Sequence, residues 1–264
     1  MENRFKSWLV KPPSQKPLGT WLSAGAPSTA EALGHCGFDF LVVDMEHVPL
    51  AIPDAVALMR AVAATPAETV LRVAWNDQVL VKLAMDAGAT TLMFPFIQNA
   101  EQAKAAVSYT RYPPDGVRGV AGMHRASRYG QTKDYLTNAN AGIAVILQLE
   151  TPAAIRQLPE IAAVPGVDAL FIGPSDLAAA MGRLGDLTHL DVQAAIADAA
   201  KAARAAAKPI GILGGTPEMV RRFLDYGYDY AAVSSDIAMM TGRAREYLSS
   251  LRGVAAAPAS SSPY

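Results

Sequence analysis

Short apolar runs alternate with Ala-rich segments of helical period along most of this chain. Eight runs are predicted to be strands, because each is almost continuously apolar and is bounded by charged or turn-forming residues. They lie at residues 19–25, 38–46, 69–75, 91–97, 143–150, 169–176, 208–215 and 230–236. Strands that are apolar on both faces are typical of a parallel sheet covered by helices, so the pattern predicts an α/β fold.

A helix is predicted after each of these runs. The stretch Ser28–Glu31 resembles a capping box, Pro53 stands at a favoured position near a helix start, and Asn99 opens a helix that reaches Tyr109. Strands and helices alternating in this number predict a (β/α)8 barrel, the TIM-barrel fold. A doubly wound open sheet is the alternative. No G-x-G-x-x-G follows the first run, which weakens a nucleotide-binding version of that alternative.

Length and composition support one domain rather than two. The chain has 264 residues, of which 51% are hydrophobic, and no shift in composition marks an internal boundary. Residues 18–252 are predicted to form the barrel, and residues 1–17 an N-terminal arm. The last residues, 253–264, are small, Pro/Ser-rich and uncharged, so a disordered tail is predicted there.

Charge and cysteine content narrow the function classes. A net charge of −1 offers no basic surface of the kind that binds nucleic acid or membranes, so neither is expected as a partner. No apolar stretch approaches the ~20 residues of a membrane span. Cys36 is the only cysteine, which rules out an intramolecular disulfide and indicates a reducing compartment, the cytoplasm.

Polar residues gather at the carboxyl-terminal ends of the predicted strands, where barrel enzymes carry their active sites. The third run contains Arg72 within its apolar stretch. The residues at the ends of other runs are Trp21, Ser23, Asp44, Glu46, His47, Gln148, Glu150, Gly173, Ser175, Asp176, Leu213, Ser235 and Asp236. No lysine stands at such an end, which disfavours a Schiff-base mechanism.

Glu150 and Asp176 each close an apolar strand, and adjacent strands would bring the two carboxylates to one rim of the barrel. Two carboxylates that lie close together repel unless a cation or a proton lies between them. Oxygen ligands of this kind suit Mg2+ or Mn2+, so a divalent metal site is predicted. The alternative is that the two side chains cap the helices that follow.

Arg72 and His47 each allow a structural and a functional interpretation. Arg72 could form a buried salt bridge, for example with Asp44, or could donate hydrogen bonds to a carbonyl oxygen or a developing oxyanion. His47 could be an ordinary surface or core residue, a general acid/base or a metal ligand. For Glu46, packing or a salt bridge is as compatible with the sequence as a role in chemistry.

Together these residues resemble the HpcH/HpaI aldolase family of metal-dependent class II pyruvate aldolases. The matching stretches include LVVDMEHVP, LRVAWND, PPDGVRG, ILQLET, FIGPSDLA and GILGGTPE, and the resemblance runs from about Leu18 to Leu251. Met45 departs from the family pattern, in which a small residue is common at that place. The resemblance implies a phosphoenolpyruvate/pyruvate-type barrel whose last helix is exchanged between subunits of a homohexamer, a dimer of trimers.

The resemblance also implies roles for single residues. Glu150 and Asp176 would hold the divalent metal, Mg2+, Mn2+ or Co2+, which pyruvate would chelate through its carboxylate and C2 oxygen. Arg72 would stabilise the enolate oxygen, and His47 would be the acid/base, paired with Asp86 of an adjacent subunit. The residues implied in contacting the substrate are Arg72, Trp21, Gln148, Gly173, Ser175, Asp176 and Leu213. Asp44 would support the water network around them.

The implied activity is reversible cleavage of 4-hydroxy-2-oxo acids to pyruvate and an aldehyde through a metal-stabilised enolate. The implied enzyme is an aldolase for 4-hydroxy-2-oxoheptanedioate or for 2-keto-3-deoxy sugar acids. Such an activity would belong to the catabolism of aromatic compounds or sugar acids. The alternatives are a citramalyl- or malyl-CoA lyase, a decarboxylase or cyclase that uses the same enolate, and a non-catalytic barrel. The presence of Glu150, Asp176 and Arg72 disfavours the last alternative. The sequence leaves the aldehyde and the preferred metal open.

Overall fold

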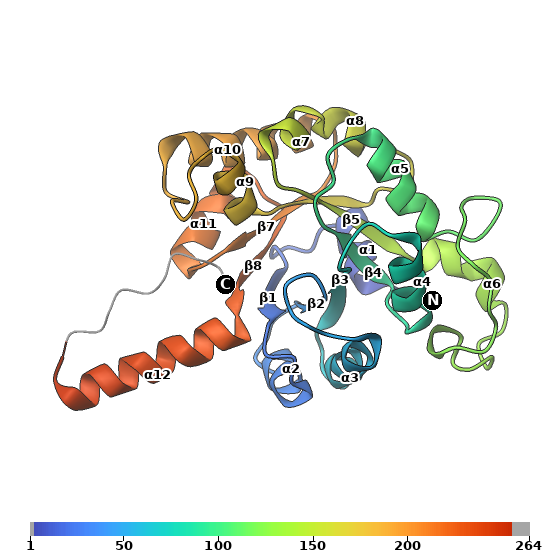
Figure 1. Cartoon of the computed structure of the whole chain (residues 1–264), viewed down its shortest axis with the longest axis horizontal. Coiled ribbons are helices and arrows are strands. Elements are labelled where there is room, and N and C mark those ends of the chain that lie inside the picture. The colour runs from blue at the N-terminus through green and yellow to red at the C-terminus, as the bar shows by residue number, and fades with distance from the viewer. Residues whose placement is uncertain (1–2, 255–264) are drawn as a thin grey trace.

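Eight parallel strands form a closed barrel in the computed structural model, which describes residues 3–254 (Figure 1). Each strand pairs with the next along the chain, and β8 pairs with β1 to close the ring. The strands are β1 Leu18–Leu22, β2 Phe40–Asp44, β3 Glu68–Arg72, β4 Thr91–Phe94, β5 Ala144–Leu149, β6 Ala169–Ile172, β7 Ile210–Gly214 and β8 Tyr230–Ser235. The predicted (β/α)8 barrel is therefore confirmed.

Most of the helices surround the barrel and cover its outer face (Figure 1). The α-helices of the described residues are α1 Arg4–Val10, α2 Pro27–Gly34, α3 Ile52–Ala63, α4 Gln78–Asp86, α5 Ala100–Tyr109, α6 Tyr135–Asn138, α7 Pro152–Arg156, α8 Leu158–Ala162, α9 Pro174–Ala180, α10 Leu190–Ala205, α11 Pro217–Tyr226 and α12 Asp236–Arg252. Short 3-10 turns lie at Arg125–Ser127 and Ala139–Gly142 within the long connection between α5 and β5.

The helix starts follow local sequence chemistry in most places. α5 begins where predicted, and Asn99 caps it by accepting a hydrogen bond from the Gln102 backbone N–H. The predicted capping box at Ser28–Glu31 is wrong, because α2 begins at Pro27 and has no side-chain cap. The Thr29 hydroxyl instead donates to the Ala26 carbonyl and to Asp236, so tertiary contacts replace the local motif.

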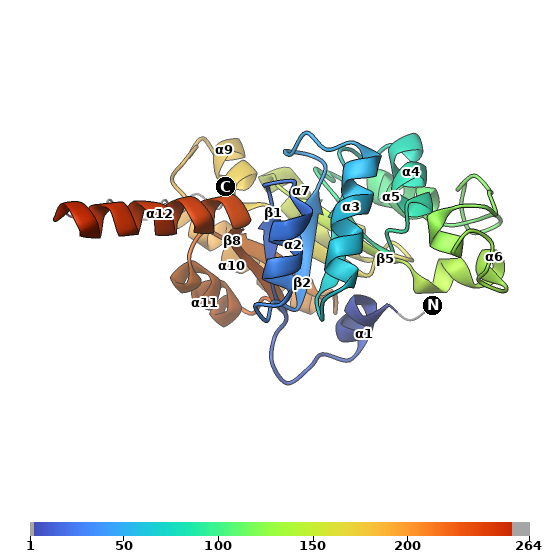
Figure 2. The same ribbon diagram turned by 90° about the horizontal axis from the view of Figure 1, so that it is seen from below.

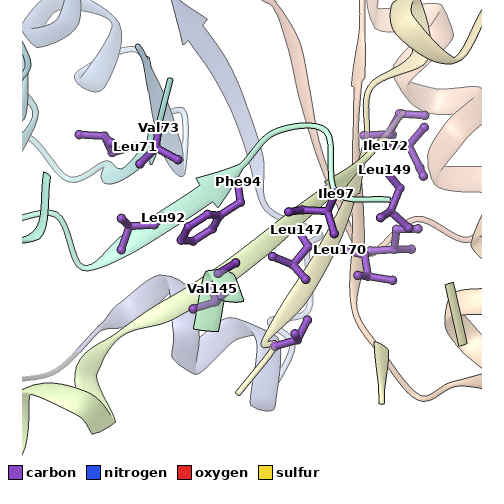
Figure 3. Close-up of a cluster of buried hydrophobic side chains, with 14 of the residues drawn as sticks. Leu71, Val73, Leu92, Phe94, Ile97, Val145, Leu147, Leu149, Leu170 and Ile172 are labelled. Carbon is purple, nitrogen blue, oxygen red and sulfur yellow. The ribbon is translucent and has the colours of Figure 1, made fainter. Parts of the chain in front are cut away.

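Alternation along each strand sorts its side chains into two apolar layers. On β3 to β6, Leu71, Leu92, Leu147 and Leu170 point outward and pack beneath the helices (Figure 3). Full burial of a side chain of this size stabilises the fold by about 1.5–3 kcal/mol relative to exposure. The intervening residues point into the barrel and fill it.

The N-terminal segment closes the barrel at the amino-terminal ends of its strands (Figure 2). The predicted arm, residues 1–17, contains the helix α1, whose Phe5 is only 1% exposed. The Phe5 ring meets Phe40 and Tyr230 edge-on, with centroids 5.4 and 5.5 Å apart. The predicted tail falls, apart from Gly253 and Val254, outside the described residues.

α12 extends away from the barrel as a long helix (Figures 1 and 2). Large apolar side chains along it are exposed, including Met240 at 58%, Tyr247 at 57% and Leu251 at 85%. Within residues 3–254, no helix combines the length and the apolar character needed to cross a membrane.

Candidate active site

The inner rows of the strands turn from apolar to charged toward their carboxyl-terminal ends. On β2, Phe40 and Val42 fill the barrel, and Asp44 follows two residues later on the same face. On β3, Val70 is followed in the same way by Arg72. The strict period of two therefore places an acid and a base side by side above the barrel core, and Asp44 and Arg72 are register partners.

Arg72 is completely buried and is held between two carboxylates. Its Nε donates to Asp44 Oδ1 at 2.9 Å and its Nη2 to Asp44 Oδ2 at 2.7 Å, a bidentate ion pair. Its Nη1 lies 2.7 Å from Glu46 Oε2. The guanidinium carbon also lies 5.3 Å from the centre of the Trp21 ring. The Asp44 salt bridge that the sequence allowed is thus present, and Glu46, for which a salt bridge was one of the open alternatives, is a second partner.

His47 stands at the edge of this cluster and reaches solvent. Its side chain is 53% exposed, and Nε2 lies 3.8 Å from Glu46 Oε2. The Asp44 carboxylate accepts a hydrogen bond from the Glu46 backbone N–H at 3.0 Å, which fixes the turn after β2. The geometry gives the imidazole access to a bound molecule while a carboxylate stays within reach.

Glu150 is buried at the end of β5 and its carboxylate is oriented by two donors. Gln148 Nε2 donates to Oε1 at 2.8 Å, and the Phe96 backbone N–H donates to Oε2 at 2.9 Å. Phe96 reaches this position with a left-handed backbone, φ 54°, which is unusual for a bulky residue. A Cβ at Gly173, directly after β6, would clash with the Glu150 side chain, so the close approach there requires glycine.

Carboxylates repel one another strongly in this part of the rim. Burial raises the pKa of Glu150 to about 8, and the neighbouring Glu46 and Asp176 add to the effect, against an opposing contribution from Arg72. Burial likewise raises the pKa of Glu46, against opposing contributions from Arg72 and His47, and Asp44 and Asp176 add smaller effects in the raising direction. A positive charge beyond that of Arg72 would relieve this repulsion.

The donor set fits a hard divalent cation that is completed by substrate and water. Among residues 3–254, no three His, Cys, Asp or Glu side chains converge as a complete metal site. Mg2+ is commonly bound through only one or two carboxylates, with its remaining ligands supplied by substrate and water.

Asp176 lies in the first turn of α9, where Gly173 is the N-cap and makes no side-chain cap bond. Asp176 therefore does not act as the N-cap of α9.

A cavity of about 400 Å3 opens beside these side chains. Its lining residues are Ser23, Asp44, His47, Val48, Pro49, Ser175, Asp176, Ser235 and Ile237. Two of the predicted substrate contacts, Trp21 and Leu213, lie deeper in the barrel core and are 0% and 1% exposed. The Trp21 ring packs against the Arg72 guanidinium there, so this contact helps to hold Arg72 in position.

Asp86 lies apart from His47 in the single chain. It is the last residue of α4, and its carboxylate contacts Arg118 at 2.7 Å and His124 at 3.6 Å. Of the predicted site residues, the chain brings together Asp44, Arg72, His47, Glu150 and Asp176. Asp86 is not part of that group in one subunit.

Comparison with known proteins identifies the family. Residues 18–241 match the family described as HpcH/HpaI aldolase/citrate lyase. The chain belongs to this family. The HpcH/HpaI protein is 53% identical to 2-dehydro-3,6-dideoxy-6-sulfogluconate aldolase from Pseudomonas putida, over 94% of this chain and 97% of the relative. It is 43% identical to 4-hydroxy-2-oxo-heptane-1,7-dioate aldolase from Klebsiella pneumoniae, over 91% and 90% of the two chains.

A solved structure of this family confirms the architecture. The protein from Burkholderia cenocepacia is 44% identical, superposes with a TM-score of 0.91, and is matched over 95% of this chain and 99% of its own. In the present HpcH/HpaI barrel, sequence reasoning missed the roles of Glu46 and of the Phe96 peptide. Glu46 lies between Asp44 and His47 in the sequence, but nothing there distinguishes it from any other acidic residue at a strand end. No feature of the sequence indicates that the backbone of Phe96 would contact the site.

Proposed function

We propose that this protein is a divalent-metal-dependent class II pyruvate aldolase, a carbon–carbon lyase. It would reversibly cleave 4-hydroxy-2-oxo acids to pyruvate and an aldehyde. The observation that carries the proposal is a fully buried Arg72, clamped by Asp44 beside a buried Glu150 whose ionisation is disfavoured unless a cation is bound. The named aldolases among its relatives support the same class of reaction.

Glu150 and Asp176 would hold the cation, and Gln148 would keep the Glu150 carboxylate oriented. When bound, a divalent cation such as Mg2+, Mn2+ or Co2+ would supply Lewis-acid stabilisation of negative charge on the substrate oxygens. The raised pKa of Glu150 supports this assignment, because burial and the neighbouring carboxylates outweigh the stabilisation of its carboxylate by Arg72, and a bound cation would offset that cost.

Arg72 would donate hydrogen bonds to the oxygen that becomes the enolate as the C3–C4 bond breaks. The clamp by Asp44 keeps the guanidinium in place before substrate arrives, so little reorganisation is required. His47 would take the proton of the C4 hydroxyl, and the electron pair of the breaking bond would pass to the pyruvate fragment. The backbone amides around Gly173, Ser175 and Asp176, at the start of α9, would receive the pyruvate carboxylate.

The aldehyde half would face the cavity near Ser23 and Ser235. The relatives act on substrates as different as a sulfonated sugar acid and a heptanedioate, as their names state, so the family relation alone leaves the aldehyde open. A CoA-ester lyase is a weaker candidate, because both relatives named above are aldolases. We expect the enzyme to work in the cytoplasm, since its single cysteine precludes an intramolecular disulfide.

We further propose a homohexamer in which α12 is exchanged between subunits. The exposed apolar side chains of α12 support this, because a projecting helix with such a surface gains stability by packing on another subunit. Two apolar side chains close in sequence to Asp86 or to its neighbour His124 are also exposed, Leu83 at 45% and Met123 at 78%. A contact there would carry Asp86 toward His47 of a neighbouring subunit.

The test is a retro-aldol screen with a panel of 4-hydroxy-2-oxo acids, in which pyruvate release is coupled to lactate dehydrogenase. We expect pyruvate release from at least one substrate, loss of that activity in EDTA, and recovery when Mg2+, Mn2+ or Co2+ is added in excess. Cleavage that persists at full rate in the chelated, metal-free protein would exclude the proposed mechanism.

A further inference from the structure

Asp86 carries a carboxylate at a place where a helix disfavours one. It is the carboxyl-terminal residue of α4, and the negative end of the helix dipole destabilises an anion there. The chain compensates with a cation from the long connection that follows α5. Arg118 Nη2 donates to Asp86 Oδ1 at 2.7 Å.

Arg118 is built into the protein rather than lying on its surface. Its side chain is 0% exposed, the guanidinium lies 4.4 Å from the Tyr112 ring centre, and Nη2 also donates to the Tyr135 hydroxyl at 3.3 Å. Burying a guanidinium is strongly unfavourable unless a partner compensates for the lost hydration. Asp86 is that partner, so the two side chains hold each other in one geometry.

His124 lies near the same oxygen without hydrogen-bonding to it. Its Nδ1 accepts a hydrogen bond from the Ser127 backbone N–H at 3.2 Å, so the proton of the neutral ring belongs on Nε2. That Nε2 lies 3.6 Å from Asp86 Oδ1, and the ring packs edge-on against Tyr135. Within residues 3–254, the polar contacts of Asp86 thus all reach Oδ1, while the side chain is still 24% exposed.

We infer that Arg118 is a positioning residue, which fixes Oδ1 of Asp86 through a hydrogen bond, with His124 packed beside it, and leaves Oδ2 for a donor outside this chain. The inference rests on the proposed function, in which that donor is the ring N–H of His47 in a neighbouring subunit. The pair of Arg118 and Asp86 would set the His47 tautomer so that its other nitrogen accepts the C4 hydroxyl proton, and would stabilise the imidazolium that forms.

A double-mutant cycle tests the inference in the assembled protein. Asp86→Asn is expected to lower kcat for cleavage by roughly 10- to 100-fold, the range for loss of an orienting partner. Arg118→Met should lower kcat by a similar factor and leave KM nearly unchanged. Arg118→Met in the Asp86→Asn background should cost less than about twofold more, because its effect passes through Asp86. Arg118→Lys should recover most of the rate.

Arg111→Met is the matched control. Arg111 is a buried arginine on the same connection, but its Nη1 donates to the Thr110 hydroxyl and not to Asp86. This variant should lose stability as Arg118→Met does and keep the wild-type kcat. If the fold reductions in kcat caused by Arg118→Met and Asp86→Asn instead multiply in the double variant, the two residues act independently and the inference is overturned.

A second readout does not require turnover. The 15N shifts of the His47 ring, assigned with His47→Gln, report its tautomer and hydrogen bonding in the assembled protein. They should change in Arg118→Met and Asp86→Asn and remain wild-type in Arg111→Met. Unchanged shifts in Arg118→Met would refute the positioning role whether or not the aldolase proposal holds. Failure of every substrate in the retro-aldol screen would instead count against the proposed function.

Discussion

The ionisation of Glu150 makes the stability of the metal-free protein depend on pH in an unusual direction. Burial and the nearby Glu46 and Asp176 raise the pKa of Glu150 from the ordinary 4.5 to about 8. In the unfolded chain the carboxyl loses its proton near its ordinary pKa, whereas the folded protein retains that proton until about pH 8. Between these values the folded state binds the extra proton, so the free energy of unfolding falls as pH rises.

The size of the change in unfolding free energy follows from the difference between the two pKa values of Glu150. At about 1.4 kcal/mol per pH unit, the range from 4.5 to about 8 corresponds to roughly 5 kcal/mol. This stability is fully present below pH 4.5 and is lost as pH rises through about 8. Saturating divalent cation should remove the dependence, because the ligand form is the carboxylate and the cation replaces the proton.

The assay is urea unfolding in EDTA across this range at a fixed protomer concentration, with Glu150→Gln as the control. The variant keeps the shape of the side chain and cannot ionise. The difference in unfolding free energy between wild type and variant should fall steadily with rising pH. A difference that stays flat, or that grows with pH, would refute the assignment of a buried, repelled carboxylate at this position.

Three further substitutions test other parts of the site. Arg72→Met should abolish cleavage and lower the free energy of unfolding by about 3–5 kcal/mol, since a buried carboxylate loses its partner, as urea titration would measure. His47→Gln should lower kcat by roughly 10²–10⁴-fold while calorimetry finds unchanged metal affinity. Gly173→Ala should weaken metal binding more than tenfold, because its Cβ would displace the Glu150 carboxylate, whereas Gly122→Ala, in open space, should leave it unchanged.

Much of the barrel, and of the site at the carboxyl-terminal ends of its strands, could be predicted from the sequence. The two-residue period of a strand determines which side chains point into the barrel. Once Phe40 and Val42 are assigned to the inner row, Asp44 must lie on it, and Arg72 follows from Val70 in the same way. Neighbouring parallel strands then bring their ends together. The pairing of Asp44 with Arg72 needed no more than this register and the cost of an unpaired buried charge.

Other features depended on contacts that no local pattern encodes. α1 plugs the barrel because Phe5 meets rings from β2 and β8, which lie far away in the sequence. The Phe96 peptide reaches Glu150 only through a left-handed backbone. Glu46 could be recognised as an acid near the rim, but its place between Arg72 and His47 depends on how the turn after β2 folds.

Enolate formation is the central claim, and it can be measured without knowing the aldehyde. In D2O, an enzyme that converts pyruvate to its enolate exchanges the pyruvate methyl protons for deuterium, which proton NMR follows directly. We predict rapid exchange with wild-type protein and Mn2+ or Co2+, none in EDTA, and none with Arg72→Met. Absence of exchange in the metal-loaded wild-type protein, or exchange that proceeds equally in EDTA, would contradict the proposed mechanism.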